Sequence, residues 1–182
     1  MKLLLVLLLV AFSFAAQYNA LKAGESWEED IEILVDLGRH TWGGYMTELF
    51  YKEYDLKTEC LGPKFTNYTI EMVRTMYYED DIIIAFIKMF ENMGHMYELT
   101  HQNCDPDRVY DLIDEQCTGS KCEWVKMLFR IESHMTKLLK LYDDIWYHLN
   151  KYYKDVEEAE IGFEQIGDDL AKGTHIVLGM KE

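Results

Sequence analysis

The sequence predicts an all-α protein: a disulfide-stapled bundle of about four to six helices with one long C-terminal helix. Three observations support this fold class. Apolar residues make up 49% of the 182 residues and charged residues 28%, so the chain can bury a core. Apolar side chains recur every three or four residues, as on one face of a helix. Only 2 prolines and 11 glycines interrupt them.

Residues 1–15 have the pattern of a signal peptide. Lys2 precedes the apolar run Leu3–Phe12, and small residues follow at the positions that a signal peptidase requires. The run is too short to span a bilayer, which takes about 20 residues. We therefore expect export without a transmembrane span, to the extracellular space or to the lumen of the secretory pathway, a granule or a lysosome. Residues 16–182 would then form a single helical domain.

The first helix is predicted to begin at a capping box, Ser26 to Glu29. Its apolar face continues to Leu56 and is interrupted at Gly43-Gly44. Two glycines inside a helix cost about 2 kcal/mol, so either the helix breaks there or a neighbour packs closely against them. A stop at 61–63 precedes a second helical region, which starts near Thr66 to Thr69.

Two further helices have clear start signals. Three acidic residues at 79–81 suit a helix N-terminus. The segment Ile82–Leu99 that follows is apolar around most of its circumference, which is typical of a buried central helix. Asp105-Pro106 places an N-cap and a first-turn proline before a short helix that ends near Gln116.

The strongest pattern covers residues 120–170. A second capping box, Ser120 to Glu123, precedes apolar residues at alternating steps of four and three from Trp124 to Leu170. One straight helix of this length would measure about 70 Å. Because helices beyond about 25 residues are uncommon, an amphipathic helix of an ordinary bundle, broken or kinked near Gly162, is favoured over a coiled coil. Residues 160–182 are either a docking tail or a frayed end.

Four cysteines in an exported chain predict two disulfides. If residues 105–116 are helical, Cys104 and Cys117 lie about 20 Å apart, too far for a bond that requires Cα atoms within about 7 Å. The favoured pairing is Cys60–Cys104 with Cys117–Cys122. The pairing Cys60–Cys117 with Cys104–Cys122 remains open.

Asn67 is a candidate modification site. It begins Asn67-Tyr68-Thr69, the only glycosylation sequon in the sequence. Because a signal peptide would deliver the chain to the glycosylation machinery, we expect Asn67 to be glycosylated and exposed.

Nucleophilic catalysis finds little support. The chain has no G-x-S-x-G motif and no phosphate-binding glycine loop. Ser133 precedes His134, but adjacent helical side chains point about 100° apart. His148 and Asp144 lie one turn apart and are expected to form no more than a surface ion pair. We predict no catalytic residue.

Metal binding is also disfavoured. Glu98 and His101 form an E-x-x-H motif near Glu91 and His95, but a di-iron centre needs a second such motif. Four acidic residues are spaced loosely like a calcium loop, without its glycine at the sixth position and its glutamate at the twelfth. These residues are Asp105, Asp107, Asp111 and Asp114. We predict no metal ligand and no cofactor.

Composition narrows the functional classes. A net charge of −15 repels nucleic acid, so we expect no nucleic-acid partner. Thirteen tyrosines and four tryptophans exceed what a core of this size needs, and both types are enriched at binding surfaces. The leading hypothesis is an exported interaction or assembly protein without catalytic activity, which binds a protein partner or itself. The alternative is a carrier that holds a lipid or other apolar ligand among methionines. These are Met72, Met76, Met89, Met93 and Met96. A secreted hydrolase has less support.

Peptide mapping of the unreduced protein tests the disulfide hypothesis. If the favoured pairing is right, tryptic digestion should release one peptide pair joined through Cys60 and Cys104 and another joined through Cys117 and Cys122. A peptide that joins Cys60 to Cys122 would mean that residues 105–116 are not helical.

Overall fold

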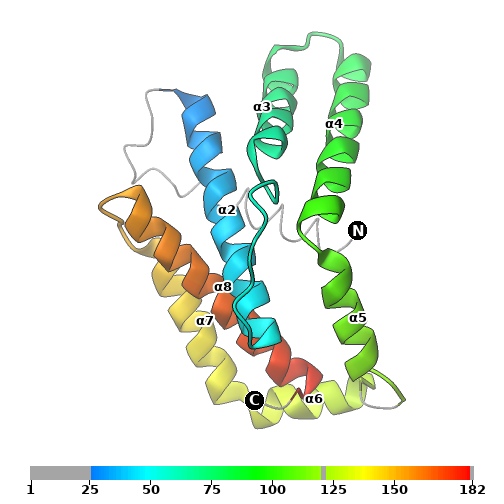
Figure 1. Cartoon of the computed structure of the whole chain (residues 1–182), viewed down its shortest axis with the longest axis vertical. Coiled ribbons are helices and arrows are strands. Elements are labelled where there is room, and N and C mark those ends of the chain that lie inside the picture. The colour runs from blue at the N-terminus through cyan, green and yellow to red at the C-terminus, as the bar shows by residue number, and fades with distance from the viewer. Residues whose placement is uncertain (1–25, 120–121, 181–182) are drawn as a thin grey trace. The chain divides into compact units, whose positions relative to one another are not determined.

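The chain folds into helices throughout the part that the structure, a computed structural model, describes: residues 26–119 and 122–180. There are seven in these ranges: α2 (Trp27–Phe50), α3 (Pro63–Tyr78), α4 (Ile82–Asn103), α5 (Pro106–Gln116), α6 (Trp124–Ser133), α7 (Met135–Asn150) and α8 (Val156–Leu178) (Figure 1). The all-α prediction is confirmed, with more helices than the four to six expected. The predicted signal peptide, residues 1–15, and the predicted cap Ser120 lie outside the described residues.

The described residues divide into two compact units. Residues 26–39 and 56–107 form the hairpin unit, and residues 40–55 and 108–180 form the C-terminal unit. Helix α2 contributes its first part to the hairpin unit and its last part to the C-terminal unit. Within residues 26–119 and 122–180, no helix combines the length and the apolar character that a membrane crossing requires.

The hairpin unit is built on the antiparallel pair α3 and α4 (Figure 1). Helix α3 begins at Pro63, where a missing amide costs nothing. The carboxylate of Asp81 accepts hydrogen bonds from the amides of Ile83 and Ile84 at 2.9 and 3.2 Å, so the predicted acidic start of α4 is confirmed. A disulfide between Cys60 and Cys104 joins the base of the hairpin.

The prediction that Ile82–Leu99 is a buried central helix is wrong. Met96 is the buried residue of α4, and most of its other large apolar side chains are exposed. Helix α3 covers one face of α4. The sequence pattern records how wide the apolar arc of a helix is, but it does not record how many neighbours cover that arc.

The C-terminal unit has its core where the end of α2 meets α5 and α8. Met46 and Leu49 of α2, Val109 of α5 and Ala171 of α8 are buried together. Partly buried apolar side chains surround them: Trp42, Tyr45, Phe50, Tyr54, Leu112 and Ile113. Helix α2 ends at Phe50, short of the predicted Leu56. The core residues Met46 and Leu49 therefore lie in the last two turns of this helix.

Helices α2 and α8 pass each other with their backbones in contact at two glycines. A Cβ atom on Gly44 would overlap the carbonyl oxygen of Glu164. A Cβ atom on Gly167 would overlap the carbonyl oxygen of Thr41 and lie 2.6 Å from the amide nitrogen of Tyr45. Of the two readings of the glycine pair, close packing of a neighbour is therefore correct, and α2 continues through it.

The prediction of one long C-terminal helix is wrong, because the segment forms α6, α7 and α8. His134 separates α6 from α7, and residues 151–155 turn the chain so that α8 runs back along α7 (Figure 1). The carboxylate of Asp155 starts α8 by accepting a hydrogen bond from the amide of Glu158 at 2.8 Å. A four-three spacing is the same along one long helix and along two antiparallel ones, so the spacing concealed the turn.

Gly162, where a break was expected, lies buried inside α8. The ring of Tyr153 occupies the space that a side chain at position 162 would need. The Tyr153 hydroxyl donates to the carbonyl oxygen of His148 at 2.7 Å, at the end of α7. This glycine serves the packing of the α7–α8 turn.

The end of the chain is ordered as a helix as far as residue 178 and docks on the body of the protein, so it is not frayed there. Ile166, Ala171 and His175 of α8 are buried. The guanidinium of Arg130 donates to the carbonyl oxygen of Leu178 at 2.8 Å, and Gly179 adopts φ 68° as a left-handed C-cap. Helix α8 is therefore part of the core.

Adding one methyl group where α2 and α8 cross should make the protein easier to unfold. We expect Gly167→Ala to lower the free energy of unfolding by about 3 kcal/mol, because the new atom meets backbone that cannot move aside. Gly173→Ala in the same helix is the matched control, since its Cβ meets nothing within 4 Å. That control should gain about 0.5–1 kcal/mol from helix propensity. Urea unfolding measures both, and equal stability of the two variants would contradict the close crossing.

Candidate functional site

A row of exposed apolar side chains runs along α4. It consists of Ile83, Phe86, Phe90, Met93 and Tyr97, which we call the α4 face. Ile83 and Phe90 are 68% and 67% exposed, so nothing within the hairpin unit covers them. Their steps of three, four, three and four residues are the heptad spacing of helices that pack side by side.

The tip of the hairpin extends this surface and carries negative charge. Tyr77, Tyr78 and Ile82 are also exposed. Residues 79–103 contain five acidic residues and one lysine, Lys88. The Lys88 ammonium lies 2.5 Å from a carboxylate oxygen of Glu79. The α4 face is therefore an apolar row within an acidic segment.

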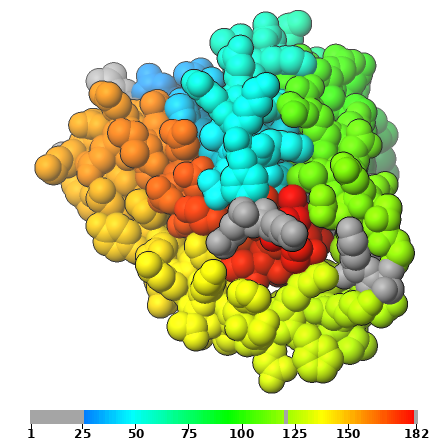
Figure 2. All heavy atoms as spheres, turned by 60° about the horizontal axis from the view of Figure 1, so that its bottom comes forward, coloured from blue at the N-terminus to red at the C-terminus, as the bar shows by residue number. Residues whose placement is uncertain are grey.

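A second exposed apolar surface covers α6 and α7 in the C-terminal unit. On α7 the exposed side chains are Met135, Leu139, Tyr142 and Trp146, and on α6 they are Trp124, Val125, Leu128 and Phe129. We call these eight residues the α6–α7 face. Figure 2 shows the atoms of α6 and α7, yellow-green to yellow, on the surface of the molecule. Residues 124–154 contain six basic and three acidic residues, so this surface lies in a basic segment of an acidic chain.

The α7 helix is apolar over a wider arc than α8 covers. The side chains toward α8, Leu138, Leu141, Ile145 and Leu149, are partly buried. The neighbouring row that includes Tyr142 and Trp146 stays open, and these two rings stack with centroids 6.3 Å apart. Monomeric proteins rarely expose contiguous apolar patches beyond a few hundred Å², and larger ones mark binding sites.

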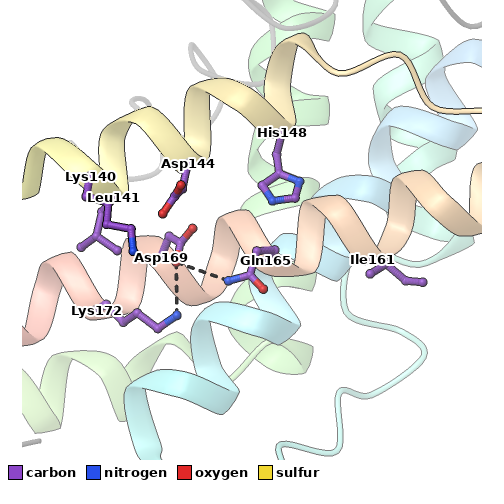
Figure 3. A pocket seen from close by; sticks show the side chains of 8 residues that line it. All are labelled: Lys140, Leu141, Asp144, His148, Ile161, Gln165, Asp169 and Lys172. Carbon is purple, nitrogen blue, oxygen red and sulfur yellow. Dashed lines mark hydrogen bonds and ion pairs between the residues drawn. The ribbon is translucent and has the colours of Figure 1, made fainter. Parts of the chain in front are cut away.

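An open cleft of about 440 Å³ lies between α7 and α8 (Figure 3). Asp144 and His148 project into it from α7. Asp169 of α8 is buried and accepts hydrogen bonds from Gln165 at 3.3 Å and from Lys172 at 3.2 Å. Among the described residues, the ion pair expected between Asp144 and His148 is not formed, and the His148 Nδ1 atom lies 3.4 Å from the Tyr153 hydroxyl.

The carboxylate of Asp168 is held at the α2–α8 crossing. One of its oxygens lies 3.1 Å from the point where a Gly44 side chain would begin. Burial raises the pKa of Asp168 from 3.8 to about 6. Lys172 opposes this shift of the pKa, and the nearby carboxylates of Glu48, Glu164 and Asp169 add to it. The crossing therefore holds a carboxyl group that is costly to ionise.

A second open cleft, of about 360 Å³, lies where α6 ends. Here the expectation that Ser133 and His134 point apart is wrong: the Ser133 hydroxyl oxygen is 2.9 Å from the His134 Nδ1 atom, because the helix stops at Ser133. Both atoms also lie 3.0 Å from the carbonyl oxygen of Arg130. A carbonyl only accepts, so the hydroxyl and a protonated Nδ1 both donate to it. The pair caps α6, and this arrangement does not activate a nucleophile.

Several of the residues considered for metal binding have other partners. The His95 ring stacks on Tyr68 with centroids 4.9 Å apart. The His101 Nε2 atom lies 3.2 Å from a carboxylate oxygen of Asp107, and Glu98 accepts from Gln102 at 3.0 Å. Asp105 pairs with Lys57 at 3.3 Å.

The methionines considered for a ligand cavity are divided between core and surface. Met72 and Met96 are buried, whereas Met76 and Met93 are exposed. Neither of the two clefts described above is lined by them.

His175 is a buried polar residue that the sequence did not single out. Its side chain is almost completely enclosed, with Nε2 3.3 Å from the carbonyl oxygen of Glu48 and Nδ1 3.2 Å from the Tyr51 hydroxyl. A neutral ring that carries its proton on Nε2 satisfies both contacts. His175 thus ties α8 to the end of α2, a role without a local sequence signal.

The cysteines adopt the favoured pairing. Cys60 bonds to Cys104 and Cys117 to Cys122, with Cα atoms 4.8 and 4.9 Å apart. Asn67 is exposed on α3, where a glycan has room; its glycosylation stays a prediction.

Comparison with known proteins gives no assignment: no family model matches the chain, and no curated protein or solved structure shows significant similarity to it.

Removing the charge of Asp168 should stabilise the protein at neutral pH. A carboxyl whose pKa is raised in the folded state favours folding below its unfolded value, near 4, and loses that contribution as the pH rises through about 6. We expect Asp168→Asn to raise the free energy of unfolding by about 1 kcal/mol at about pH 7.5, a figure reduced for partial exposure to solvent. The gain should approach zero near pH 4. Urea unfolding at both pH values measures it, with the exposed Asp143→Asn as the control for charge. A gain that is equal at both pH values would contradict the assignment.

Proposed function

We propose that the protein is an exported interaction or assembly protein that binds through the α4 face and the α6–α7 face and has no catalytic role. The observation that carries the proposal is the α4 face, a row of five large apolar side chains at heptad spacing, each more than a third exposed. Water contact with such a row is unfavourable by about 25 cal/mol for each Å² of apolar surface. A partner that covers the row recovers this free energy.

The composition of these surfaces also supports binding. Aromatic residues and methionine are enriched at protein interfaces, and the α4 face contains Phe86, Phe90, Met93 and Tyr97. The α6–α7 face adds two tryptophans, the residue type most often found among energetically dominant contacts. The two clefts are open and contain no activated nucleophile among the groups described above.

Export is supported by the disulfides. Two disulfides and no membrane-spanning helix among the described residues are compatible with an extracellular protein. The signal peptide, the glycan and the final compartment remain predictions.

Photo-crosslinking tests the proposed function. A photoreactive amino acid at position 90 or 139, in the chain expressed by its native source, should attach to a protein that covers the face. The same amino acid at Thr136, which is exposed outside the apolar row of α7, is the matched control and should give far less product. If positions 90 and 139 label no protein above that control, the proposed function is wrong.

A further inference from the structure

We propose that the partner of each apolar face is a second copy of this chain: the α4 face of one copy packs against the α6–α7 face of another. The inference rests on the proposed function and adds the identity of the partner. Three properties of the two faces carry it: their spacing, their length and their charge.

The spacing suits helix-to-helix packing. The α4 face advances by three, four, three and four residues, and the α7 part of the other face, from Met135 to Trp146, advances by four, three and four. These are the intervals at which side chains of one helix enter the spaces between side chains of another. A lipid surface places no such demand on spacing.

The lengths also agree. From Ile83 to Tyr97 the α4 face measures about 21 Å, and from Met135 to Trp146 the α7 row measures about 17 Å, at 1.5 Å per residue. Each row therefore covers most of the other. The exposed residues of α6 add further apolar side chains to the second face.

The charges favour contact between an α4 face and an α6–α7 face over contact between two identical faces. Residues 79–103 have a net charge of −4, from five acidic residues and one basic residue. Residues 124–154 have a net charge of +3, from six basic and three acidic residues. Two α4 faces would bring like charges together, whereas an α4 face and an α6–α7 face bring opposite charges together. An anionic membrane would attract the second face and repel the first.

In this pairing each copy contributes two different surfaces. Two copies that exchange both contacts form a closed dimer, and copies that each use their faces on different neighbours form a ring or a filament. In either assembly, a copy with one damaged face still binds an intact copy through its other face. Only a copy with both faces damaged stays monomeric in such a mixture.

The test is a complementation experiment with two surface variants of the full disulfide-bonded chain. Ile83→Glu with Phe90→Glu disables the α4 face, and Leu139→Glu with Tyr142→Glu disables the α6–α7 face. All four positions are more than half exposed, so the fold should tolerate the changes. Far-ultraviolet circular dichroism and urea unfolding check this. Gln102→Glu with Thr136→Glu adds two negative charges on exposed polar positions as the matched control.

Sedimentation velocity reads out the association. The unmodified chain and the control should self-associate, and each variant alone should bind itself at least tenfold more weakly, as expected when central contacts are lost. An equimolar mixture of the two variants should form a 1:1 heterodimer, because each supplies the face that the other lacks. For the unmodified chain, raising the salt concentration from about 0.05 to about 0.5 M should weaken association several-fold, since salt screens the opposite charges.

Several results would overturn the inference. The unmodified chain could be monomeric, or the equimolar mixture of the two variants could stay monomeric. The α6–α7 variant could still self-associate, or the control could self-associate as weakly as the variants. Finally, added salt could strengthen the association of the unmodified chain. A monomer that floats with phosphatidylserine-containing vesicles would identify lipid as the occupant instead. If photo-crosslinks at position 90 join a different protein while the chain is monomeric, the proposed function stands and this inference fails.

Discussion

The contact between the backbones of α2 and α8 is the constraint on which the rest of the C-terminal unit depends. Only a residue without a side chain fits at Gly44 and Gly167, and this closeness places Met46 and Ala171 in one core. It also holds the Asp168 carboxylate over the backbone of α2. One face of α8 packs against α2 and another packs against α7, so α8 covers only part of α7. The open row on α7 thus follows from how α8 is anchored.

Local signals in the sequence were reliable because they act within a few residues. The hydrogen bond from the amide of Glu29 to Ser26, the Asp81 cap and the proline that starts α5 are where the sequence predicted them. Helix geometry disfavoured the bond between Cys104 and Cys117 and left two disulfide pairings open, of which the structure shows the favoured one. Burial was less predictable, as Ile82–Leu99 shows, since it depends on neighbours that a periodic pattern does not specify.

The candidate site, too, could be predicted from the sequence only in part. An excess of tyrosine and tryptophan predicted a binding surface, but its place on α4, α6 and α7 required the structure. The contact between Ser133 and His134 was missed because it exists only where a helix ends, and the heptad pattern continues through that position. His175 gave no local signal because its partners, Glu48 and Tyr51, are more than a hundred residues away.

The disulfide between Cys60 and Cys104 encloses both helices of the hairpin in one covalent ring, across a sequence separation of 44 residues. By chain-entropy arguments such a closure contributes about 4 kcal/mol. It also affects how the hairpin responds to proteolysis. A protease that cuts the exposed turn at residues 79–81 would leave the two halves tethered at their base. The row from Ile83 to Tyr97 would therefore stay attached to α3 after a single cut.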